Sequence, residues 1–522
     1  MITIEQKKDC CGCNACGDIC PQNAISFNTD NEGFWYPSID QSKCVNCGLC
    51  DKVCPMQNEY RTSGAIDKPE CYAAEHKSVE VVFSSTTGGM FSAMADVMYK
   101  RKGYVGGAIH NSDFSVSEFI SNDKKDLDLL RRSKDLQSDA IGFYLDVKKL
   151  LNDGESVLVC ALPCQIAALK TFLGKDYDNL ITIDLICLGV NSPKVWRKYL
   201  DYIEKLNNSK IVWTENKSKE YGWHNLTQKF VFENGKEYFD TSNTSLFIKG
   251  FIKSHLYCRP SCYDCQFKKF PRPADISIGD FWGIERRDSF FNSNMGTSVV
   301  IVNTKKGKTF FEDVKKRIIF KETPLEWVLS GNPALTRSIT DISDKRKEFF
   351  DELECSPFDV AIEKYGNLDK KSAIVYDLIC HGKFDQLAKC AIFCAEGGLI
   401  SANPARRYGE YGYQEFLDEM LSSGGIDKRL LLNEKALKSH LHIIKKDFDI
   451  LAQFKYDGGI IEQDITVIYS EHDSTCINMD EWGKITVGNI SYKTLGDNHF
   501  FLNQCYKEMA DIINNQLKEW IY

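Results

Sequence analysis

From Cys71 onward, short apolar runs alternate with amphipathic stretches. Two runs, SVLVCAL at residues 156–162 and LITIDLICL at residues 180–188, have the length and β-branched content of buried strands. A helix is predicted directly after FSSTTGG, where apolar residues recur near helical spacing: Met90, Phe91, Met94, Val97 and Met98. Strands that alternate with helices in this way predict an α/β domain.

The last third of the chain contains a second alternation. Three runs, AIFCAEGG, DITVIYSEHD and NISYKTLGDNHFF, predict strands that each end in a turn. A helix is predicted over EYGYQEFLDEMLSSGGID, and another over residues 434–456, where Leu437, Leu441, Ile444, Phe448 and Leu451 recur near helical spacing. Asp473 follows the second strand and His499 follows the third, which is the order of the last two triad members in an α/β-hydrolase.

Composition restricts the class of protein. The chain has 522 residues, 43% hydrophobic and 26% charged, so two or three globular domains are expected. A formal net charge of −8 argues against nucleic acid as the main partner. No apolar run is long enough to span a bilayer, and the first twenty residues do not resemble a signal peptide, so we expect a cytoplasmic protein. Twenty-two cysteines in such a chain favour metal or redox chemistry over disulfides.

Nine cysteines lie in two runs near the N-terminus, CCGCNACGDICP and CVNCGLCDKVCP. Each run contains C-x2-C-x2-C-x3-C-P, in which three thiolates bind one 4Fe–4S cluster and the fourth binds the other cluster. The pattern predicts two clusters, one on Cys10, Cys13, Cys16 and Cys54 and one on Cys44, Cys47, Cys50 and Cys20. Zinc is the alternative, but it requires neither the triple spacing nor the two prolines. Cys11 is off the pattern, and residues 1–60 resemble a bacterial-type ferredoxin module of α+β fold.

Further cysteines follow the strands predicted in the middle region. Cys164 follows the first strand in LPCQ, and Cys187 lies at the end of the second in LICLG. Because ligands bind outside the carboxyl ends of parallel strands, these two thiols are expected to face one site. The loop YCRPSCYDCQFK adds Cys258, Cys262 and Cys265, and the whole set favours a third cluster. The alternative is that Cys164 and Cys187 are buried as small hydrophobic residues.

The segment SSTTGG at residues 84–89 places hydroxyls and glycines at the start of the predicted helix. Backbone N–H groups and the helix dipole bind anions at such a position. The same residue types also cap ordinary helices, which is the alternative. The segment is not G-x-G-x-x-G, so a standard dinucleotide fingerprint is absent.

Five segments, in this order, resemble the family of coenzyme F(420) hydrogenase/dehydrogenase beta subunits: SSTTGGMFSAMA, ALPCQIAAL, IDLICLGVNSPKVW, LYCRPSCYDCQFKKFPRPADISIGDFWGIE and GTSVVIVNT. The resemblance covers residues 71–366. It implies an α/β domain that binds FAD and iron–sulfur clusters and reduces a deazaflavin, a tetrapyrrole or another oxidised substrate. It further implies that a third 4Fe–4S cluster is bound by Cys164, Cys187, Cys262 and Cys265, with Cys258 as a spare.

The resemblance also implies where FAD lies. The residues over which it would lie are Ser84, Ser85, Thr87, Gly88 and Gly89, with Asp280, Trp282 and Gly283 of GDFWG lining the same cavity. The chain departs from the family at ICLGV, where relatives often have C-H-G-V. Leu188 therefore puts a proton-donor role at that position in doubt.

Residues 371–522 resemble the second half of a type II thioesterase, the editing hydrolase of nonribosomal peptide and polyketide assembly lines. Asp473 and His499 would be the last two members of its triad. The chain has no G-x-S-x-G, and the nearest stretch, LICHGKFD, lacks both the serine and the second glycine. The sequence therefore favours a partial α/β-hydrolase-like region, used for docking or stability, over a thioesterase that another chain completes.

Together these patterns predict an α+β ferredoxin module, an α/β flavin and iron–sulfur domain and a partial hydrolase-like region. The leading function is an iron–sulfur flavoprotein reductase of an anaerobe that passes electrons from reduced ferredoxin or flavodoxin through 4Fe–4S clusters to FAD. Its acceptor would be a small-molecule or carrier-bound substrate, which the thioesterase resemblance associates with natural-product biosynthesis. The alternative is a non-catalytic electron-transfer subunit that serves a separate enzyme, which would need clusters but no FAD.

Overall fold

The computed structural model describes residues 2–366, apart from 61, 243, 292–293 and 340–342, and beyond them mainly 390–394, 411–422, 464–470 and 478–496. The chain divides into two compact units, Met1–Leu368 and Asp369–Tyr522. Among the described helices, none combines the length and the apolar character needed to cross a bilayer.

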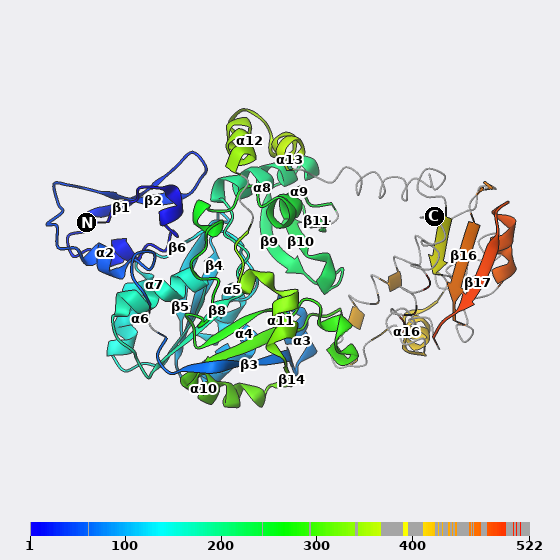
Figure 1. Cartoon of the computed structure of the whole chain (residues 1–522), viewed down its shortest axis with the longest axis horizontal. Helices are drawn as coiled ribbons and strands as arrows, with labels where there is room; N and C mark the ends of the chain where they lie inside the picture. The colour runs from blue at the N-terminus through cyan, green and yellow to red at the C-terminus, as the bar shows by residue number, and fades with distance from the viewer. Residues whose placement is uncertain are drawn as a thin grey trace. The chain divides into compact units, whose positions relative to one another are not determined.

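The N-terminal 60 residues form a small α+β module, drawn in dark blue in Figure 1. Its elements are α1 (Ala15–Asp18), the antiparallel hairpin of β1 (Ile25–Thr29) and β2 (Trp35–Ile39), and α2 (Leu49–Val53). Asp18 joins the module to the next domain, because its carboxylate accepts hydrogen bonds from the backbone N–H groups of Gly142 (2.7 Å) and Tyr144 (3.2 Å). These N–H groups lie at the N-terminus of α6 (Phe143–Asn152), where the helix dipole favours a negative charge.

A nine-stranded sheet forms the centre of the following domain. Its strands, in spatial order, are β14 (Ile318–Thr323), β3 (Ala65–His76), β13 (Ser298–Thr304), β12 (Ile276–Asp280), β8 (Leu180–Leu185), β7 (Val157–Ala161), β4 (Tyr104–His110), β5 (Val116–Ser121) and β6 (Ser138–Asp139). The two strands predicted from apolar runs are β7 and β8, and they are parallel neighbours as expected. The sheet as a whole is mixed, because β3 and β13 are antiparallel to their neighbours.

Helices cover both faces of this sheet. Leu158 of β7 packs in a core with α4 (Met90–Lys100) and α10 (Lys305–Lys315). Its neighbour Val159 packs in a different core, with α6 and α7 (Pro163–Leu173). Successive strand residues point to opposite faces, which explains why these strands are apolar throughout. The other helices around the sheet are α3 (Val79–Phe83), α5 (Leu127–Leu130) and α11 (Leu325–Gly331).

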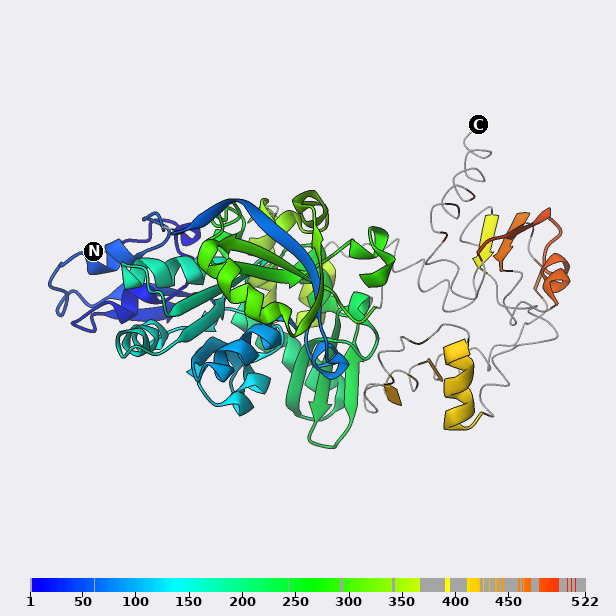
Figure 2. The same cartoon turned by 90° about the horizontal axis from the view of Figure 1, so that it is seen from below.

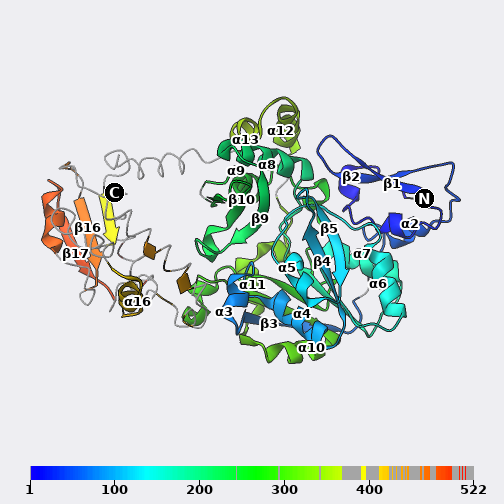
Figure 3. The ribbon, with the colours of Figure 1, turned by 180° about the vertical axis from the view of Figure 1, so that it is seen from behind.

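A second, three-stranded sheet packs beside the large one. It consists of β9 (Ile211–Ser218), β10 (Thr227–Phe232) and β11 (Glu237–Asp240), all antiparallel. Helices α8 (Pro193–Asn207), α9 (Leu246–Ile248), α12 (Ser343–Cys355) and α13 (Phe358–Tyr365) share its apolar core. Figure 3 shows α12 and α13 beside α8 at one end of these strands.

The C-terminal unit contains a parallel sheet of β15 (Cys390–Cys394), β16 (Asp464–Tyr469) and β17 (Ile490–Thr494), with α16 (Tyr413–Ser422) (Figure 2). The three strands predicted for this part of the chain are therefore confirmed. The stretch LICHGKFD, Asp473 and His499 lie outside the described residues, and residues 434–456 are described only at isolated positions.

Candidate metal and cofactor sites

The two N-terminal cysteine runs adopt the same backbone turn. The residues on either side of Cys13 and of Cys47 have positive φ. They are Gly12 (75°) and Asn14 (63°) in the first run, and Asn46 (54°) and Gly48 (70°) in the second. Glycine and asparagine adopt this left-handed conformation most readily. Each turn leads into a short helix, α1 or α2. Glycine and asparagine exchange places between the two loops. This exchange is a sequence signal, separate from the cysteine spacing, that the two loops are equivalent.

The hollow that we name the cluster-two site lies near the surface of the module. It is lined by the four cysteines that the spacing assigns to one cluster: Cys20, Cys44, Cys47 and Cys50. Two of the sulfurs accept hydrogen bonds from backbone N–H groups, Cys20 from Ala24 (3.4 Å) and Cys50 from Ile2 (3.3 Å). Such donors stabilise thiolate ligands of an iron–sulfur cluster.

The cluster-one site, formed by Cys10, Cys13, Cys16 and Cys54, is more deeply placed. Cys13, Cys16 and Cys54 are each at most 9% exposed. Burial, together with the neighbouring thiol of Cys13, raises the pKa of Cys54 to about 11. A hydrogen bond with Cys11 and burial raise the pKa of Cys13, and burial raises the pKa of Cys16, so without iron these three thiols keep their protons at neutral pH, and metal binding has to displace them.

The third site combines residues that are far apart in the sequence. One hollow, with about 530 Å³ of empty space partly open to solvent, is lined by Cys11, Cys164, Cys187, Cys262 and Cys265. Cys164 lies in the first turn of α7, Cys187 follows β8, and Cys262 ends a short 3₁₀ turn. The sheet thus brings together the four cysteines that the family resemblance implies.

Two further cysteines lie near the third site. Cys258 is fully buried in the core beside α8, 3.8 Å from Asn191 Oδ1, and does not line the hollow. Cys11, which the pattern left as a bystander, does line it, and its thiol is in hydrogen-bond contact with Cys13 and Cys164. Cys11 therefore connects the cluster-one site with the third site.

Cysteines surround a hollow at two of these sites. Zinc draws its thiolates to within about 2.3 Å of one centre, whereas a cluster occupies a hollow between them. The cluster-two site and the third site are hollows ringed by cysteines, so the donor sets fit 4Fe–4S clusters.

Positive side chains line the third site. Arg272, 1% exposed, pairs with Asp184 (3.0 Å) and donates to the carbonyls of Phe267 (3.1 Å) and Leu185 (3.3 Å). Lys268 donates to the carbonyl of Leu188 (2.9 Å). These contacts hold the loop that carries Cys265 against the end of β8, where the two positive charges would offset the charge of thiolates bound to a cluster.

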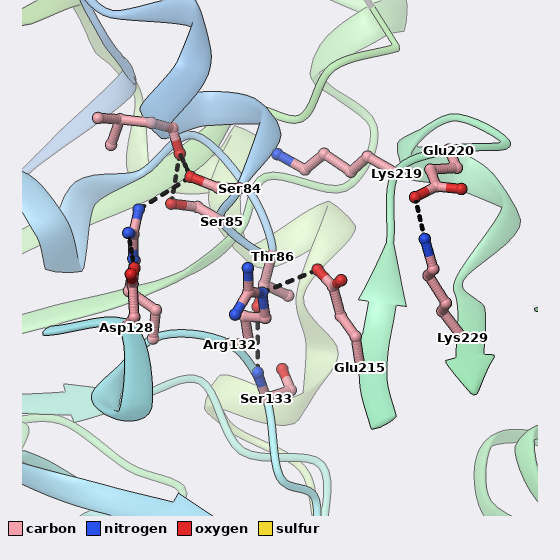
Figure 4. A network of polar contacts seen from close by, with 12 residues as sticks. Ser84, Ser85, Thr86, Asp128, Arg132, Ser133, Glu215, Lys219, Glu220 and Lys229 are labelled. Carbon is pink, nitrogen blue, oxygen red and sulfur yellow. Dashed lines mark hydrogen bonds and ion pairs between the residues drawn. The ribbon is translucent and has the colours of Figure 1, made fainter. Parts of the chain in front are cut away.

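The SSTTGG segment links α3 to α4, and most of its hydroxyls have protein partners (Figure 4). Ser84 Oγ donates to the carbonyl of Glu80 (2.8 Å) and accepts from Arg131 (2.8 Å), while Ser85 Oγ donates to the carbonyl of Val81 (2.6 Å). Within the described protein, the buried Thr87 Oγ1 has no partner. A Cβ at position 88 would lie 2.3 Å from the carbonyl oxygen of Ala74, so Gly88 is required for packing on β3.

A hollow beside this segment, which we name the flavin hollow, has about 1000 Å³ of empty space, partly open to solvent. It is lined by Glu80, Val81, Ser84, Asp128, Leu129, Arg131, Arg132 and Trp213. The guanidinium of Arg132 pairs with Glu215 (2.9 Å) and lies 5.7 Å from the Trp213 ring centre. Its volume, its two arginines and its indole suit an aromatic cofactor that carries phosphate. Local sequence patterns do not single out Arg131, Arg132 or Trp213, which come from distant segments.

The GDFWG residues contact Lys217 of β9 and Trp223 beyond it. Asp280 accepts from Lys217 Nζ and from Trp223 Nε1, both at 2.8 Å, and Trp282 stacks on Trp223 with ring centres 4.7 Å apart. Asp280, Trp282 and Gly283 do not line the flavin hollow.

Lys219 directly follows β9 and contacts the SSTTGG segment. It donates to the carbonyls of Val82 and Thr87, both at 2.6 Å, and burial lowers its pKa to about 7. Its role could not be anticipated from the sequence, because both of its partners are backbone atoms that lie far away along the chain.

Comparison with known proteins identifies the two main parts of the chain. Residues 9–58 match the 4Fe-4S dicluster domain, and residues 154–327 match the family described as the C terminus of the coenzyme F(420) hydrogenase/dehydrogenase beta subunit. The chain is 21% identical over 341 residues to the F subunit of the F(420)H(2) dehydrogenase of Methanosarcina mazei, covering 62% of this chain and 87% of the relative. A ferredoxin of Methanocaldococcus jannaschii is 35% identical over 54 residues, which are 10% of this chain and 68% of that protein.

Solved structures give weaker likenesses. A chain of the F(420)-reducing NiFe hydrogenase complex of Methanosarcina barkeri matches with a TM-score of 0.35 and 18% identity, over 58% of this chain and 92% of that one. The type II thioesterases BorB, of the borrelidin cluster, and ClbQ, of the colibactin NRPS/PKS pathway, each match with a TM-score of 0.23. Their identities are 15% and 17%, and the match covers 28% of this chain and 61% and 63% of theirs.

The cysteine loops and the family matches lead to one conclusion. The chain carries an N-terminal 4Fe-4S dicluster domain followed by the C-terminal domain of the family of coenzyme F(420) hydrogenase/dehydrogenase beta subunits.

Proposed function

We propose that the chain is an iron–sulfur flavoprotein oxidoreductase that takes electrons from reduced ferredoxin or flavodoxin and delivers them through FAD to an oxidised substrate. The observation that carries the proposal is the third hollow, where Cys164, Cys187, Cys262 and Cys265 surround one space beside Cys11 of the dicluster domain. Clusters transfer single electrons and a flavin accepts one or two, so together they join a one-electron donor to a two-electron acceptor.

Different residues of the chain would have different roles in this electron transfer. The cluster-two site is the entry point, because Cys47 and Val45 are exposed there and Val45 is 62% exposed. The buried cysteines of the cluster-one site exclude water from the next position. Arg272 and Lys268 hold the loops of the third site, and Ser84, Arg131 and Trp213 would hold the flavin.

A second candidate is an electron-transfer subunit that serves a separate enzyme. The relative from Methanosarcina mazei is named as a subunit of a dehydrogenase, which favours this candidate. Flavin separates the two functions, because a pure carrier needs clusters but no FAD.

Anaerobic purification, followed by iron, sulfide and flavin analysis, tests the proposal. We expect about twelve irons per chain, from three clusters of four, and one FAD that dithionite-reduced ferredoxin reduces. About eight irons with no flavin would leave only an electron carrier. Zinc in place of iron would contradict both candidates.

A further inference from the structure

Arg259 lies at the junction between the dicluster domain and the domain that follows. It is 0% exposed and directly precedes the 3₁₀ turn Pro260–Cys262, which carries a ligand of the third site. Its guanidinium donates to the Cys10 carbonyl (2.8 Å), to Gln137 Oε1 (2.8 Å) and to the Trp35 carbonyl (3.1 Å). It also donates to Cys10 Sγ (3.4 Å), and it lies 4.3 Å from the Tyr36 ring centre.

A buried guanidinium requires a negative partner, because an unpaired charge is costly in the protein interior. Among the described residues, no carboxylate pairs with Arg259, and its neighbours are carbonyls, an amide and aromatic rings. The Cys10 sulfur is the ionisable group to which Arg259 donates a hydrogen bond.

Arg346 at the same junction provides a contrast. Both guanidinium groups lie over the Phe34 ring, Arg259 at 5.5 Å and Arg346 at 5.9 Å from its centre. Arg346, however, makes a two-pronged ion pair with Glu32, at 2.7 and 3.2 Å. One of these two buried arginines therefore has a carboxylate partner, and the other faces a cysteine ligand.

The cluster-two site provides the other contrast. Two of its sulfurs, those of Cys20 and Cys50, accept hydrogen bonds from the backbone amides of Ala24 and Ile2, which carry no net charge. Hydrogen bonds and positive charge at the ligand sulfurs both stabilise the more negative, reduced form of a cluster.

We propose that Arg259 is the counter-ion of the cluster at Cys10, Cys13, Cys16 and Cys54, and that it raises the reduction potential of this cluster above that of the cluster-two site. The inference rests on the proposed function, because it requires both clusters. One electron taken from the donor at the exposed cluster-two site then moves inward to the buried site. The donor is oxidised by one electron, the buried site is reduced by one, and no bond forms or breaks.

Potentiometric titration of the anaerobic holoprotein, followed by EPR, tests the proposal. In Arg259→Gln the midpoint of the cluster-one site should fall by about 59 mV, a tenfold change in a one-electron equilibrium, while the cluster-two midpoint stays unchanged. Arg259→Lys keeps the charge and should give an intermediate value. Arg346→Gln, the matched control, should leave both midpoints unchanged.

Thermal unfolding gives a readout that does not depend on electron transfer. The iron-free protein has no negatively charged cluster beside Arg259, so Arg259→Gln should lower its melting temperature less than it does in the iron-loaded protein. Equal losses in the two forms, unchanged midpoints in Arg259→Gln, or the same midpoint in Arg259→Lys and Arg259→Gln would each overturn the inference. A wild-type protein that binds no clusters would overturn the proposed function as well, so the two failures are distinguishable.

Discussion

The dicluster domain and the third site each gather cysteines around a hollow, but the chain builds them in different ways. The eight dicluster cysteines lie between positions 10 and 54, on two loops whose left-handed residues, Gly12 and Asn14 in one and Asn46 and Gly48 in the other, repeat one turn. The third site takes its cysteines from positions 164 to 265, after β7, after β8 and from a distant loop.

The difference shows what each site depends on. Residues within a few positions of each cysteine determine the local loops, so the first two sites need little beyond their own module. The third site exists only where β7 and β8 pair in the correct register and where Arg272 holds the 265–272 loop against them. Variants that disturb one kind of site should therefore spare the other.

Arg272→Met should have the largest effect. It leaves Asp184, which is 0% exposed, without its partner at 3.0 Å, and breaking a buried pair costs about 3–5 kcal/mol in the free energy of unfolding. We expect loss of about four irons, those of the third site, with the dicluster signals retained. The control is Arg101→Met, whose pair with Asp313 is 42% exposed on each side, and which should cost about 0–1 kcal/mol. Full iron content in Arg272→Met would contradict the dependence on tertiary support.

Cys262→Ser tests the ligand set with little loss of stability. Iron analysis should again show a loss of about four irons, and FAD should remain bound. Its reduction by an external donor should slow by at least about tenfold, because the last carrier before the flavin is missing. Cys258→Ser is the matched control, since Cys258 is buried outside the hollow. If the two variants lose the same amount of iron, the ligand assignment is wrong.

Arg131→Gln tests the flavin hollow separately from the metal sites. The side chain lines the hollow and donates to Ser84, so its loss should weaken FAD binding by about tenfold, near 1.4 kcal/mol, without changing iron content. Flavin retained after dialysis measures the effect. Lys229→Gln, which removes ion pairs with Glu220 and Glu237 away from the hollow, should keep its flavin. Equal flavin loss in both variants would place the cofactor elsewhere.

Cys11→Ser should have the smallest effect. Its thiol touches Cys13 and Cys164 but is a fifth sulfur at a site that needs four. We therefore expect full iron content and a shift in the third-site midpoint of less than about 59 mV. Loss of iron from this variant would instead show that Cys11 is a ligand and that the cluster-one site and the third site form one unit.

Sequence reasoning succeeded where neighbouring residues determine the structure. Cysteine spacing predicted the four residues around the cluster-two site, and apolar runs predicted β7, β8 and the three strands of the C-terminal unit. The flavin residues stay a prediction. Of the residues expected there, Ser84 lines the hollow, whereas Ser85 is bonded to its own helix and Asp280 faces Lys217.

The sequence by itself determined the dicluster domain, the family of the central domain and the strand–helix order, because each depends on spacing and periodicity within a short window. Tertiary structure decided which charged groups meet the cysteines. Arg259 lies 249 positions from Cys10, and Arg272 lies 88 positions from Asp184. No periodicity links such residues, and only the docking of the module and the register of the sheet bring them into contact. The same packing removes water, and without water these few charges control the properties of the sites.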